Sequence, residues 1–203
     1  MGFFDRNRED LLRRGYSPDR LPPGQYFTDR FPVLHVGDVP ASDLSTWDLR
    51  LFGAVAQERR LSWDELRALP ETSVECDIHC VTKWTKLDTR WSGVRFRDVM
   101  ALVDVDPAAD TVIAHAEGDY TANVPLAVML DDDVVLASGY DGAPLAAEHG
   151  GPLRLLVPKR YFWKSAKWLR GLEWRIGDAP GFWERNGYHN DAKPFLEQRY
   201  WGD

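Results

Sequence analysis

The chain has 203 residues, of which 44% are hydrophobic and 12% aromatic, enough for one domain of ordinary size with a substantial core. Its net charge of −7 argues against a general nucleic-acid-binding protein, which would present a basic face. No stretch approaches the ~20 apolar residues of a membrane span, and the N-terminus lacks the apolar core of a secretory signal, so we expect a cytoplasmic protein.

The predicted elements begin with a charged arm at residues 1–30, which is rich in Pro and Gly and is expected to contain one helical turn at 8–14. Residues 31–203 are interpreted as a single domain. Runs with strand-like apolar patterns predict strands at 47–53, 73–81, 111–116, 134–140, 153–157 and 169–176.

Three helical segments are predicted between these strands. Ser62 and Glu65 form a capping box that begins a short helix. Apolar residues at i, i+3, i+4 and i+7 predict a second helix at 94–103, and Pro125 is expected at the first position of a helical turn at 125–130. Because strands outnumber helices and do not alternate regularly with them, the pattern indicates an α+β fold.

The two cysteines, Cys76 and Cys80, lie in one predicted strand. A strand would separate them by ~13 Å, too far for a disulfide. A thiolate is a ligand for a soft transition metal, but a zinc site that includes His79 is disfavoured, because His79 points to the other face of the strand. A Cys-His dyad with His115 or His149 is an alternative, and a buried inert thiol is the reading that fits Cys76 best.

A dense cationic run follows the predicted strand at 134–140. Residues 150–172 contain six Lys and Arg residues and no Asp or Glu. Within this run, Lys164-Ser165-Ala166-Lys167 offers two ammonium groups, one hydroxyl and backbone N–H groups in four residues, a mixture that suits a phosphate. The alternative interpretation is a solvated basic face.

Several motifs together resemble a known family. They read DIHCVT at 77–82, RWSGVRFRDV at 90–99, GPLRLLVP at 151–158, YFWKSAKW at 161–168 and GFWERNGYHN at 181–190. From about residue 31 to its end, the chain resembles the molybdopterin-binding domain of the sulfite oxidase family, most closely the short stand-alone prokaryotic members. The resemblance implies a mixed-sheet molybdopterin-binding fold like that of the sulfite oxidase catalytic domain.

The resemblance also implies one mononuclear molybdenum, held by a single cysteine thiolate and the dithiolene of molybdopterin. Cys80 matches the metal ligand and Cys76 does not. The implied chemistry is two-electron oxygen-atom transfer at S or N of a small-molecule substrate, with an electron-transfer partner that the sequence does not identify. Cofactor contacts are implied at His35, His115, His149, Arg154, Lys164, Ser165, Ala166 and Lys167.

The substrate side of the site departs from the family pattern. Family sulfite oxidases carry an arginine shortly after the ligand cysteine, whereas Val81-Thr82-Lys83-Trp84 follows here, so sulfite itself is not implied. Lys83, Asp119 and Tyr120 are the candidates for the substrate pocket. Asp119 and Tyr120 follow a predicted strand at a Gly118 turn, which indicates either a loop at the pocket edge or an ordinary hairpin turn.

Two other classes of function remain open at this point. One is a protein that binds or carries the molybdopterin cofactor without turnover. The other is an enzyme that uses a cysteine thiol without a metal. We expect the main class, a molybdenum-dependent oxidoreductase, and predict no interaction with nucleic acid.

Overall fold

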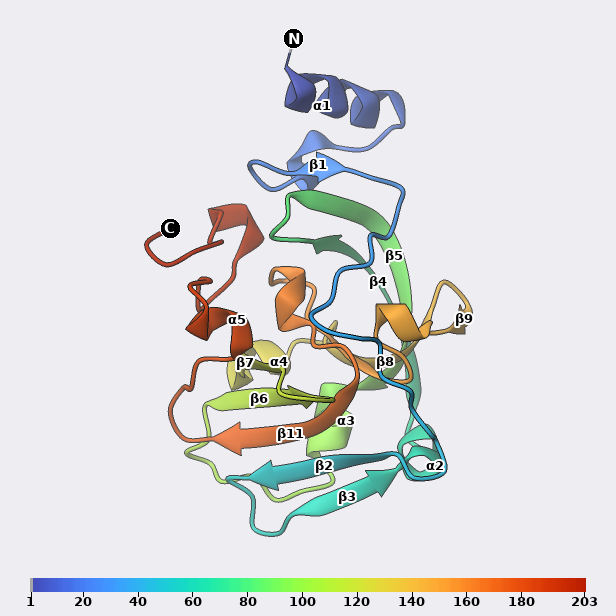
Figure 1. The fold of residues 1–203 in the computed structure, drawn as a ribbon, viewed down its shortest axis with the longest axis vertical. Helices are drawn as coiled ribbons and strands as arrows, with labels where there is room; N and C mark the ends of the chain where they lie inside the picture. The colour runs from blue at the N-terminus through green and yellow to red at the C-terminus, as the bar shows by residue number, and fades with distance from the viewer. Residues whose placement is uncertain (1) are drawn as a thin grey trace.

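Two mixed β-sheets pack against each other in this computed structural model, which describes residues 2–203 apart from the side chains of residues 3–5 (Figure 1). The first sheet contains β1 (Tyr26–Phe27), β4 (Glu71–His79), β5 (Trp84–Arg95), β8 (Val135–Tyr140), β9 (Ala143–Pro144) and β10 (Arg154–Leu156). The second has the order β3 (Arg59–Ser62), β2 (Asp48–Gly53), β11 (Leu169–Arg175), β6 (Thr111–Ala116) and β7 (Thr121–Pro125).

Helices are short and lie at the ends and edges of the sheets. They are α1 (Phe3–Arg13), α2 (Trp63–Arg67), α3 (Phe96–Met100), α4 (Leu126–Met129) and α5 (Phe182–Arg185), with 3-10 turns η1 (Pro18–Arg20), η2 (Ala147–His149), η3 (Phe162–Lys164) and η4 (Pro194–Leu196). Each sheet has one parallel pair, β1 with β5 and β11 with β2, and its other pairs are antiparallel. The predicted α+β fold is confirmed.

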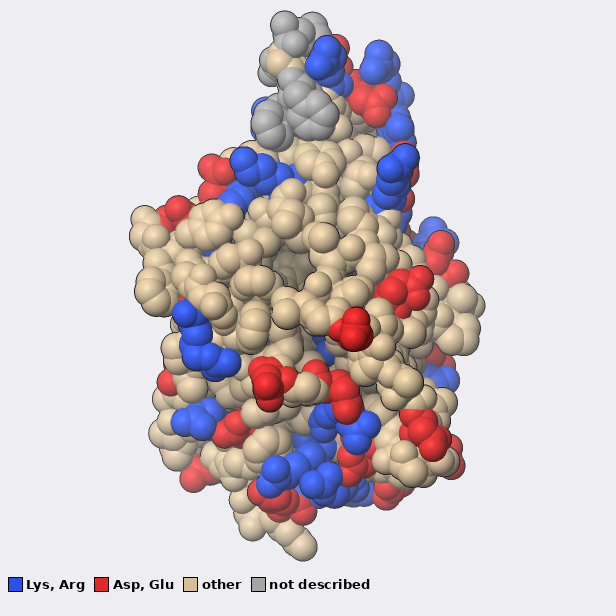
Figure 2. Space-filling model, viewed as in Figure 1, with Lys and Arg blue, Asp and Glu red and all other residues tan. Residues whose placement is uncertain are grey.

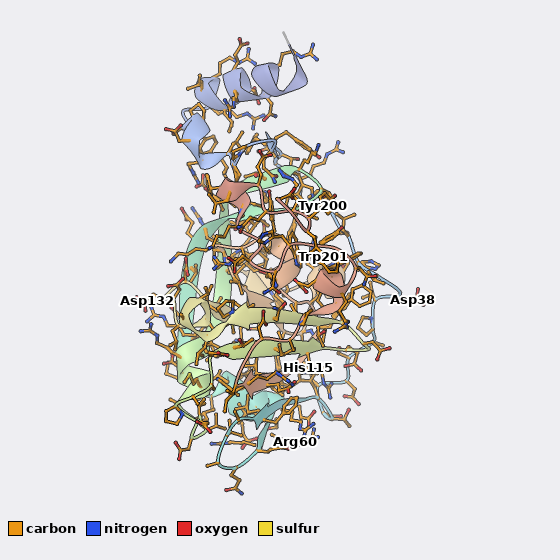
Figure 3. The ribbon with its side chains drawn as sticks, turned by 90° about the vertical axis from the view of Figure 1, so that its left-hand side faces the viewer. Asp38, Arg60, His115, Asp132, Tyr200 and Trp201 are labelled. Carbon is orange, nitrogen blue, oxygen red and sulfur yellow. The ribbon has the colours of Figure 1, made fainter. Side chains whose placement is uncertain are left out.

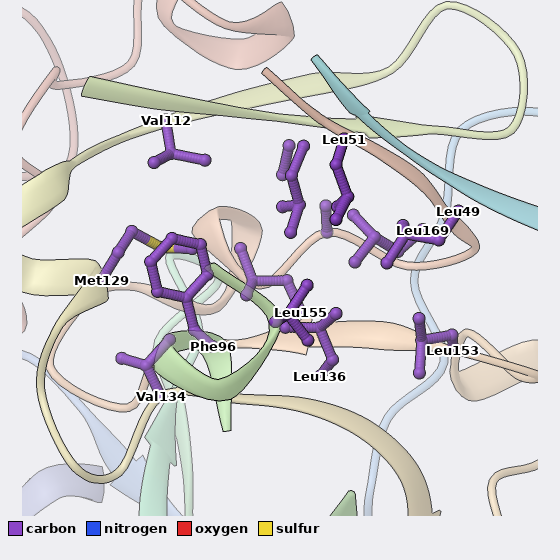
Figure 4. Close-up of a cluster of buried hydrophobic side chains, with 14 of the residues drawn as sticks. Leu49, Leu51, Phe96, Val112, Met129, Val134, Leu136, Leu153, Leu155 and Leu169 are labelled. Carbon is purple, nitrogen blue, oxygen red and sulfur yellow. The ribbon is translucent and has the colours of Figure 1, made fainter. Parts of the chain in front are cut away.

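The main hydrophobic core lies between the two sheets (Figure 4). Leu49 and Leu51 alternate with half-exposed residues along β2, so that one face of this strand is buried. Leu136 and Leu155, from β8 and β10, meet them from the other sheet. Strands β8 and β10 are buried along most of their length, which explains their nearly continuous apolar sequence.

Local sequence signals agree with the structure where they depend on near neighbours. The strand predicted at 111–116 is β6 with the same bounds. The capping box forms as predicted, because the Ser62 hydroxyl accepts from the Glu65 N–H and the Glu65 carboxylate accepts from the Ser62 N–H. Pro125 is the N-cap of α4 and not its first residue.

The helix predicted at 94–103 is wrong at its start. Strand β5 continues to Arg95, where it pairs with Val135 of β8, and α3 covers Phe96–Met100 alone. The sequence also did not predict the first part of β5 or strands β3 and β7. Strand β5 pairs with β4 on one side and β8 on the other, so long-range hydrogen bonds override its polar sequence.

The predicted N-terminal arm packs against the first sheet. Leu11 of α1 is buried with Leu21, Phe27 and Leu87 in a small separate cluster. Strand β1 lies beside the start of β5. The Gln25 side chain donates a 3.0 Å hydrogen bond to the Cys80 carbonyl, so the arm supports the turn that carries this cysteine.

Two neighbouring leucines of α1 test this packing. Leu11 is 0% exposed, whereas Leu12 is 59% exposed. We expect Leu11→Ala to lower the free energy of unfolding by about 2–5 kcal/mol, because it leaves a cavity in the cluster. The control, Leu12→Ala, should change this free energy by less than about 0.5 kcal/mol. Urea denaturation measures both, and equal small effects would show that the arm does not stabilise the domain.

Candidate functional site

A cavity of about 850 Å³ opens on the face of the molecule shown in Figure 2, where a hollow is visible near the middle. Five stretches of the chain supply its lining residues: 31–40, 80–84, 116–120, 149–168 and 182–188. The first of these belongs to the segment that runs down this face from β1 to β2 (Figure 1). Most of the lining side chains are aromatic or aliphatic. The cavity therefore collects residues that lie far apart in the sequence.

Cys80 lines this cavity from the turn that follows β4. Its N–H donates to the Trp84 carbonyl at 2.9 Å, and the turn is closed by Lys83 N–H, which donates to the Cys80 carbonyl at 3.0 Å. The Thr82 hydroxyl donates to Cys80 Sγ at 3.1 Å. Burial raises the pKa of the Cys80 thiol. This sulfur is thus fixed in position and directed to the cavity.

The other cysteine has a different environment. Cys76 does not line the cavity, and its Sγ lies 3.7 Å from the Thr89 hydroxyl within the first sheet. Burial raises the pKa of Cys76 to about 12. Among residues 2–203, no group of three or more His, Cys, Asp or Glu side chains could hold a metal ion by itself. A metal at Cys80 would therefore need further ligands from a bound cofactor.

Arg154 supplies a buried positive charge to the cavity. Its side chain is 1% exposed, and its two Nη atoms donate 2.7 Å hydrogen bonds to the carbonyl oxygens of His149 and Ser165. The guanidinium lies 4.1 Å over the Phe162 ring. Its Nε is buried without a partner, and no carboxylate of the described residues forms an ion pair with it. Desolvation lowers the pKa of Arg154 to about 9. A buried cation without a counter-charge is costly, so this site fits an anionic ligand.

The imidazole of His149 and the ammonium group of Lys167 lie near Arg154. The His149 ring stacks on Phe31, with ring centroids 3.8 Å apart, and its buried Nδ1 has no partner. Burial lowers the pKa of His149. Lys167 Nζ donates to the Glu148 carbonyl at 2.6 Å, and burial, then the charge of Arg154, lower its pKa to about 8. Both groups retain the capacity to bind a ligand in the cavity.

Close contact between Gly150 and Lys167 brings the Lys167 side chain to the cavity. Gly150 has a φ of +107°, and a Cβ at this position would lie 2.9 Å from the Lys167 Cβ. A glycine is therefore required where the turn after η2 passes the Lys167 segment. Ser165, two residues before Lys167, also lines the cavity, and its hydroxyl accepts a 2.9 Å hydrogen bond from the Val157 N–H.

The structure places several predicted site residues outside the cavity. Lys83 is exposed in the turn after Cys80, with a φ of +75°. His115 lies on β6 of the second sheet, where its Nε2 is 2.8 Å from Glu173 Oε2. It does not line the cavity, and Figure 3 shows it apart from Asp38, which does. Ala166 is buried in the core between the sheets.

Lys164 also points away from the cavity. Its side chain is 1% exposed, and Nζ lies 2.6 Å from Glu184 Oε1 and 2.8 Å from the Asn123 carbonyl oxygen. The same Glu184 oxygen accepts a 2.7 Å hydrogen bond from the indole N–H of Trp163, which does line the cavity. Lys164 therefore supports the Trp163 ring through Glu184, from the side away from the cavity.

The other predicted substrate and cofactor residues are brought together. Tyr120 lines the cavity and donates to the Trp163 carbonyl, and burial raises the pKa of its hydroxyl. Asp119 is exposed and lines the cavity beside it. His35 is exposed, lines the cavity, and packs edge-on against Trp168 with ring centroids 5.8 Å apart.

Sequence reasoning missed the aromatic wall. Trp163, Trp183 and Tyr188 line the cavity, with Trp183 and Tyr188 stacked at 4.7 Å and Trp163 edge-on to Tyr188 at 5.0 Å. The nine Trp residues of the chain and the motif at 181–190 were visible signals. Neither signal showed which rings would face a ligand.

Comparison with known proteins agrees with this geometry. The sequence model of the family described as "Oxidoreductase molybdopterin binding domain" matches residues 36–183. The chain belongs to this family of molybdopterin oxidoreductases, which confirms the predicted resemblance. No helix of the described residues is long and apolar enough to cross a membrane.

Individual relatives differ in length and in the activity that their names give. The chain is 45% identical over 192 residues to "Uncharacterized oxidoreductase YuiH" of Bacillus subtilis, covering 94% of this chain and 97% of that one. It is 30% identical over 180 residues to "Putative protein-methionine-sulfoxide reductase subunit YedZ1" of Azospira oryzae, covering 86% and 68%. It is 28% identical to the mitochondrial sulfite oxidase of Drosophila melanogaster. That match covers 88% of this chain and 34% of the sulfite oxidase.

A solved structure shows the same fold. The sulfane dehydrogenase SoxCD from Paracoccus pantotrophus superposes with a TM-score of 0.66 at 20% identity, covering 81% of this chain and 46% of that one. At this identity the likeness concerns the fold alone.

Two lysines three residues apart separate structural from ligand-binding roles. We expect Lys164→Met to lower the free energy of unfolding by about 3–5 kcal/mol, because Glu184 would remain buried without a counter-charge. Lys167→Met should lower it by no more than about 1 kcal/mol, since it loses one hydrogen bond to a carbonyl. Urea denaturation of cofactor-free protein measures both. Equal losses would contradict the different positions of the two side chains.

Proposed function

We propose that this chain binds one mononuclear molybdenum–molybdopterin in the cavity and catalyses oxygen-atom transfer at sulfur or nitrogen of a small substrate. One observation carries the proposal: a buried thiol, Cys80, and a buried guanidinium without a counter-charge, Arg154, line the same cavity. A thiolate suits a soft metal, and an unpaired buried cation suits an anionic group. Membership in the molybdopterin oxidoreductase family supports the same reading.

The residues of the cavity fit such a cofactor. Cys80 would hold the metal, and Arg154 and Lys167 would balance the negative charge of the phosphate group of molybdopterin. The free Nδ1 of His149 and the Ser165 hydroxyl would bind polar atoms of the organic part. When bound, the cofactor would supply two-electron oxygen-atom transfer.

The protein would contribute binding, orientation and exclusion of water. The stacked wall of Trp183 and Tyr188, with Trp163 held by Glu184, gives a rigid apolar surface beside the reacting centre. In the reductive direction, a sulfoxide takes up two electrons and two protons and gives a sulfide and water. The oxidative direction is the reverse. Either direction requires an external electron donor or acceptor. We propose that the protein acts in the cytoplasm.

The two cysteines test the metal assignment. We expect Cys80→Ser to abolish activity and change the molybdenum spectrum, because a hard oxygen replaces a soft sulfur. Cys76→Ser is the matched control and should keep nearly all of its metal. Activity assays and the molybdenum spectrum measure the first outcome, and molybdenum content by mass spectrometry with pterin content by fluorescence after oxidation measures the second. Loss of metal in Cys76→Ser, with metal retained in Cys80→Ser, would reverse the assignment.

A pair of lysines tests the phosphate anchor. Lys167→Ala should weaken cofactor binding by roughly 10- to 150-fold, because a hydrogen bond to a charged group contributes roughly 1.5–3 kcal/mol. Lys159→Ala is the control, since Lys159 lies outside the cavity and pairs with Asp131 at 3.0 Å. Pterin content of the purified proteins, with circular dichroism as the check on folding, gives the result. Equal full occupancy in both variants would contradict the anchor.

Activity itself is tested by a dye-coupled screen of sulfoxides, N-oxides and sulfite with molybdenum-loaded protein. Turnover that depends on Cys80 would support an enzyme. Stable cofactor binding with no turnover of any compound would instead support a protein that carries the cofactor.

A further inference from the structure

The charges around the cavity restrict the class of substrate. Resting on the function proposed above, we propose that carboxylates at the cavity mouth, Asp38 and Asp119, select neutral or cationic heteroatom oxides and disfavour anions such as sulfite.

Carboxylates outnumber Lys and Arg side chains among the residues that line the cavity. The carboxylates are Asp38, Glu117 and Asp119, the Lys and Arg residues are Arg154 and Lys167, and two histidines, His35 and His149, line it as well. All three acids are exposed, whereas Arg154 is buried and Lys167 is half-buried. The negative charges therefore lie at the opening and the positive charges lie deeper.

Neighbouring cations do not neutralise the two aspartates. Among the described residues, the side chains of Asp38 and Asp119 have no ion pair or hydrogen bond. Glu117 differs, because its Oε2 lies 3.6 Å from Arg170 Nη1, and Arg170 also pairs with Asp48 at 2.9 Å. No Lys or Arg of the described residues therefore forms an ion pair with Asp38 or Asp119 at the mouth.

The two deeper cations would not be free to bind a substrate anion. In the proposed complex, Arg154 and Lys167 balance the phosphate of the cofactor. Lys83, the nearest lysine along the chain to Cys80, does not line the cavity. An anionic substrate would then pass two carboxylates and meet no unpaired cation, which costs free energy in a partly desolvated site.

The inner wall favours the same class of substrate. Trp163, Trp183 and Tyr188 present ring faces and edges that pack well against alkyl or aryl groups. Aromatic faces also attract cations. We therefore infer a small sulfoxide or N-oxide with apolar substituents, without a negative charge.

A series of aryl methyl sulfoxides tests this inference. The three compounds differ only in the para substituent, which is trimethylammonium, methyl or carboxylate. With a reduced viologen as the electron donor, we expect kcat/KM to be at least about 10-fold lower for the carboxylate than for the methyl compound at low salt. The ratio between the trimethylammonium and carboxylate compounds should shrink as ionic strength rises from about 10 mM to about 500 mM.

Single substitutions assign the effect to the mouth. Asp38→Asn and Asp119→Asn should each lower the ratio of kcat/KM for the cationic over the anionic sulfoxide by about 3-fold, and the double variant should lower it further. Asp132→Asn is the matched control, because Figure 3 shows Asp132 and Asp38 at opposite edges of the molecule. It removes one carboxylate from the same protein and should leave the ratio unchanged.

The outcomes separate this inference from the proposed function. Preferred turnover of the carboxylate compound, or an unchanged ratio in the double variant, would overturn the charge selection and leave the proposed enzyme in place. If no sulfoxide, N-oxide or sulfite is turned over, the proposed function fails. Quenching of tryptophan fluorescence by the three compounds then still tests charge selection, which is overturned if the carboxylate compound binds as tightly as the other two.

Discussion

The Arg154 guanidinium is the group on which the arrangement of the cavity depends. It donates to the carbonyl oxygens of His149 and Ser165 and so joins the turn before β10 to the segment after η3. It lies over the Phe162 ring and has no carboxylate partner among the described residues. Burying a charge in this way is unfavourable unless an anion balances it. Its positive charge makes the cavity a site for an anion before any other residue is considered.

The two sheets place the remaining groups around this charge. Strand β4 ends at His79 and delivers Cys80 from the first sheet, while the β6–β7 hairpin of the second sheet brings Tyr120 to the same cavity. The N-terminal arm and α5 then support the turn at Cys80 and the ring of Trp163. A thiol, two cations and an aromatic wall are thus brought to one cavity by the packing of the two sheets, and the exposed carboxylates Asp38 and Asp119 line the same cavity.

Lys164 and Lys167 show where reasoning from sequence stops. Both stand in one cationic run, and both were predicted to bind the cofactor. In the structure, Lys167 lines the cavity, whereas Lys164 forms a buried ion pair with Glu184. Glu184 lies on a separate helix later in the chain, so its position could not be derived from the local pattern. His115 is similar, because Glu173 on the adjacent strand holds its ring outside the cavity.

By itself, the sequence determined the features that depend on near neighbours or on a short motif. The capping box of Ser62 and Glu65 and the bounds of β6 belong to this group. Only the tertiary structure decided which cations face the cavity, that β5 continues through 84–95, and that two unpaired aspartates lie at the mouth. The physical reason is that burial, strand pairing and charge balance are set by residues far apart in the chain, which come together only when the two sheets pack.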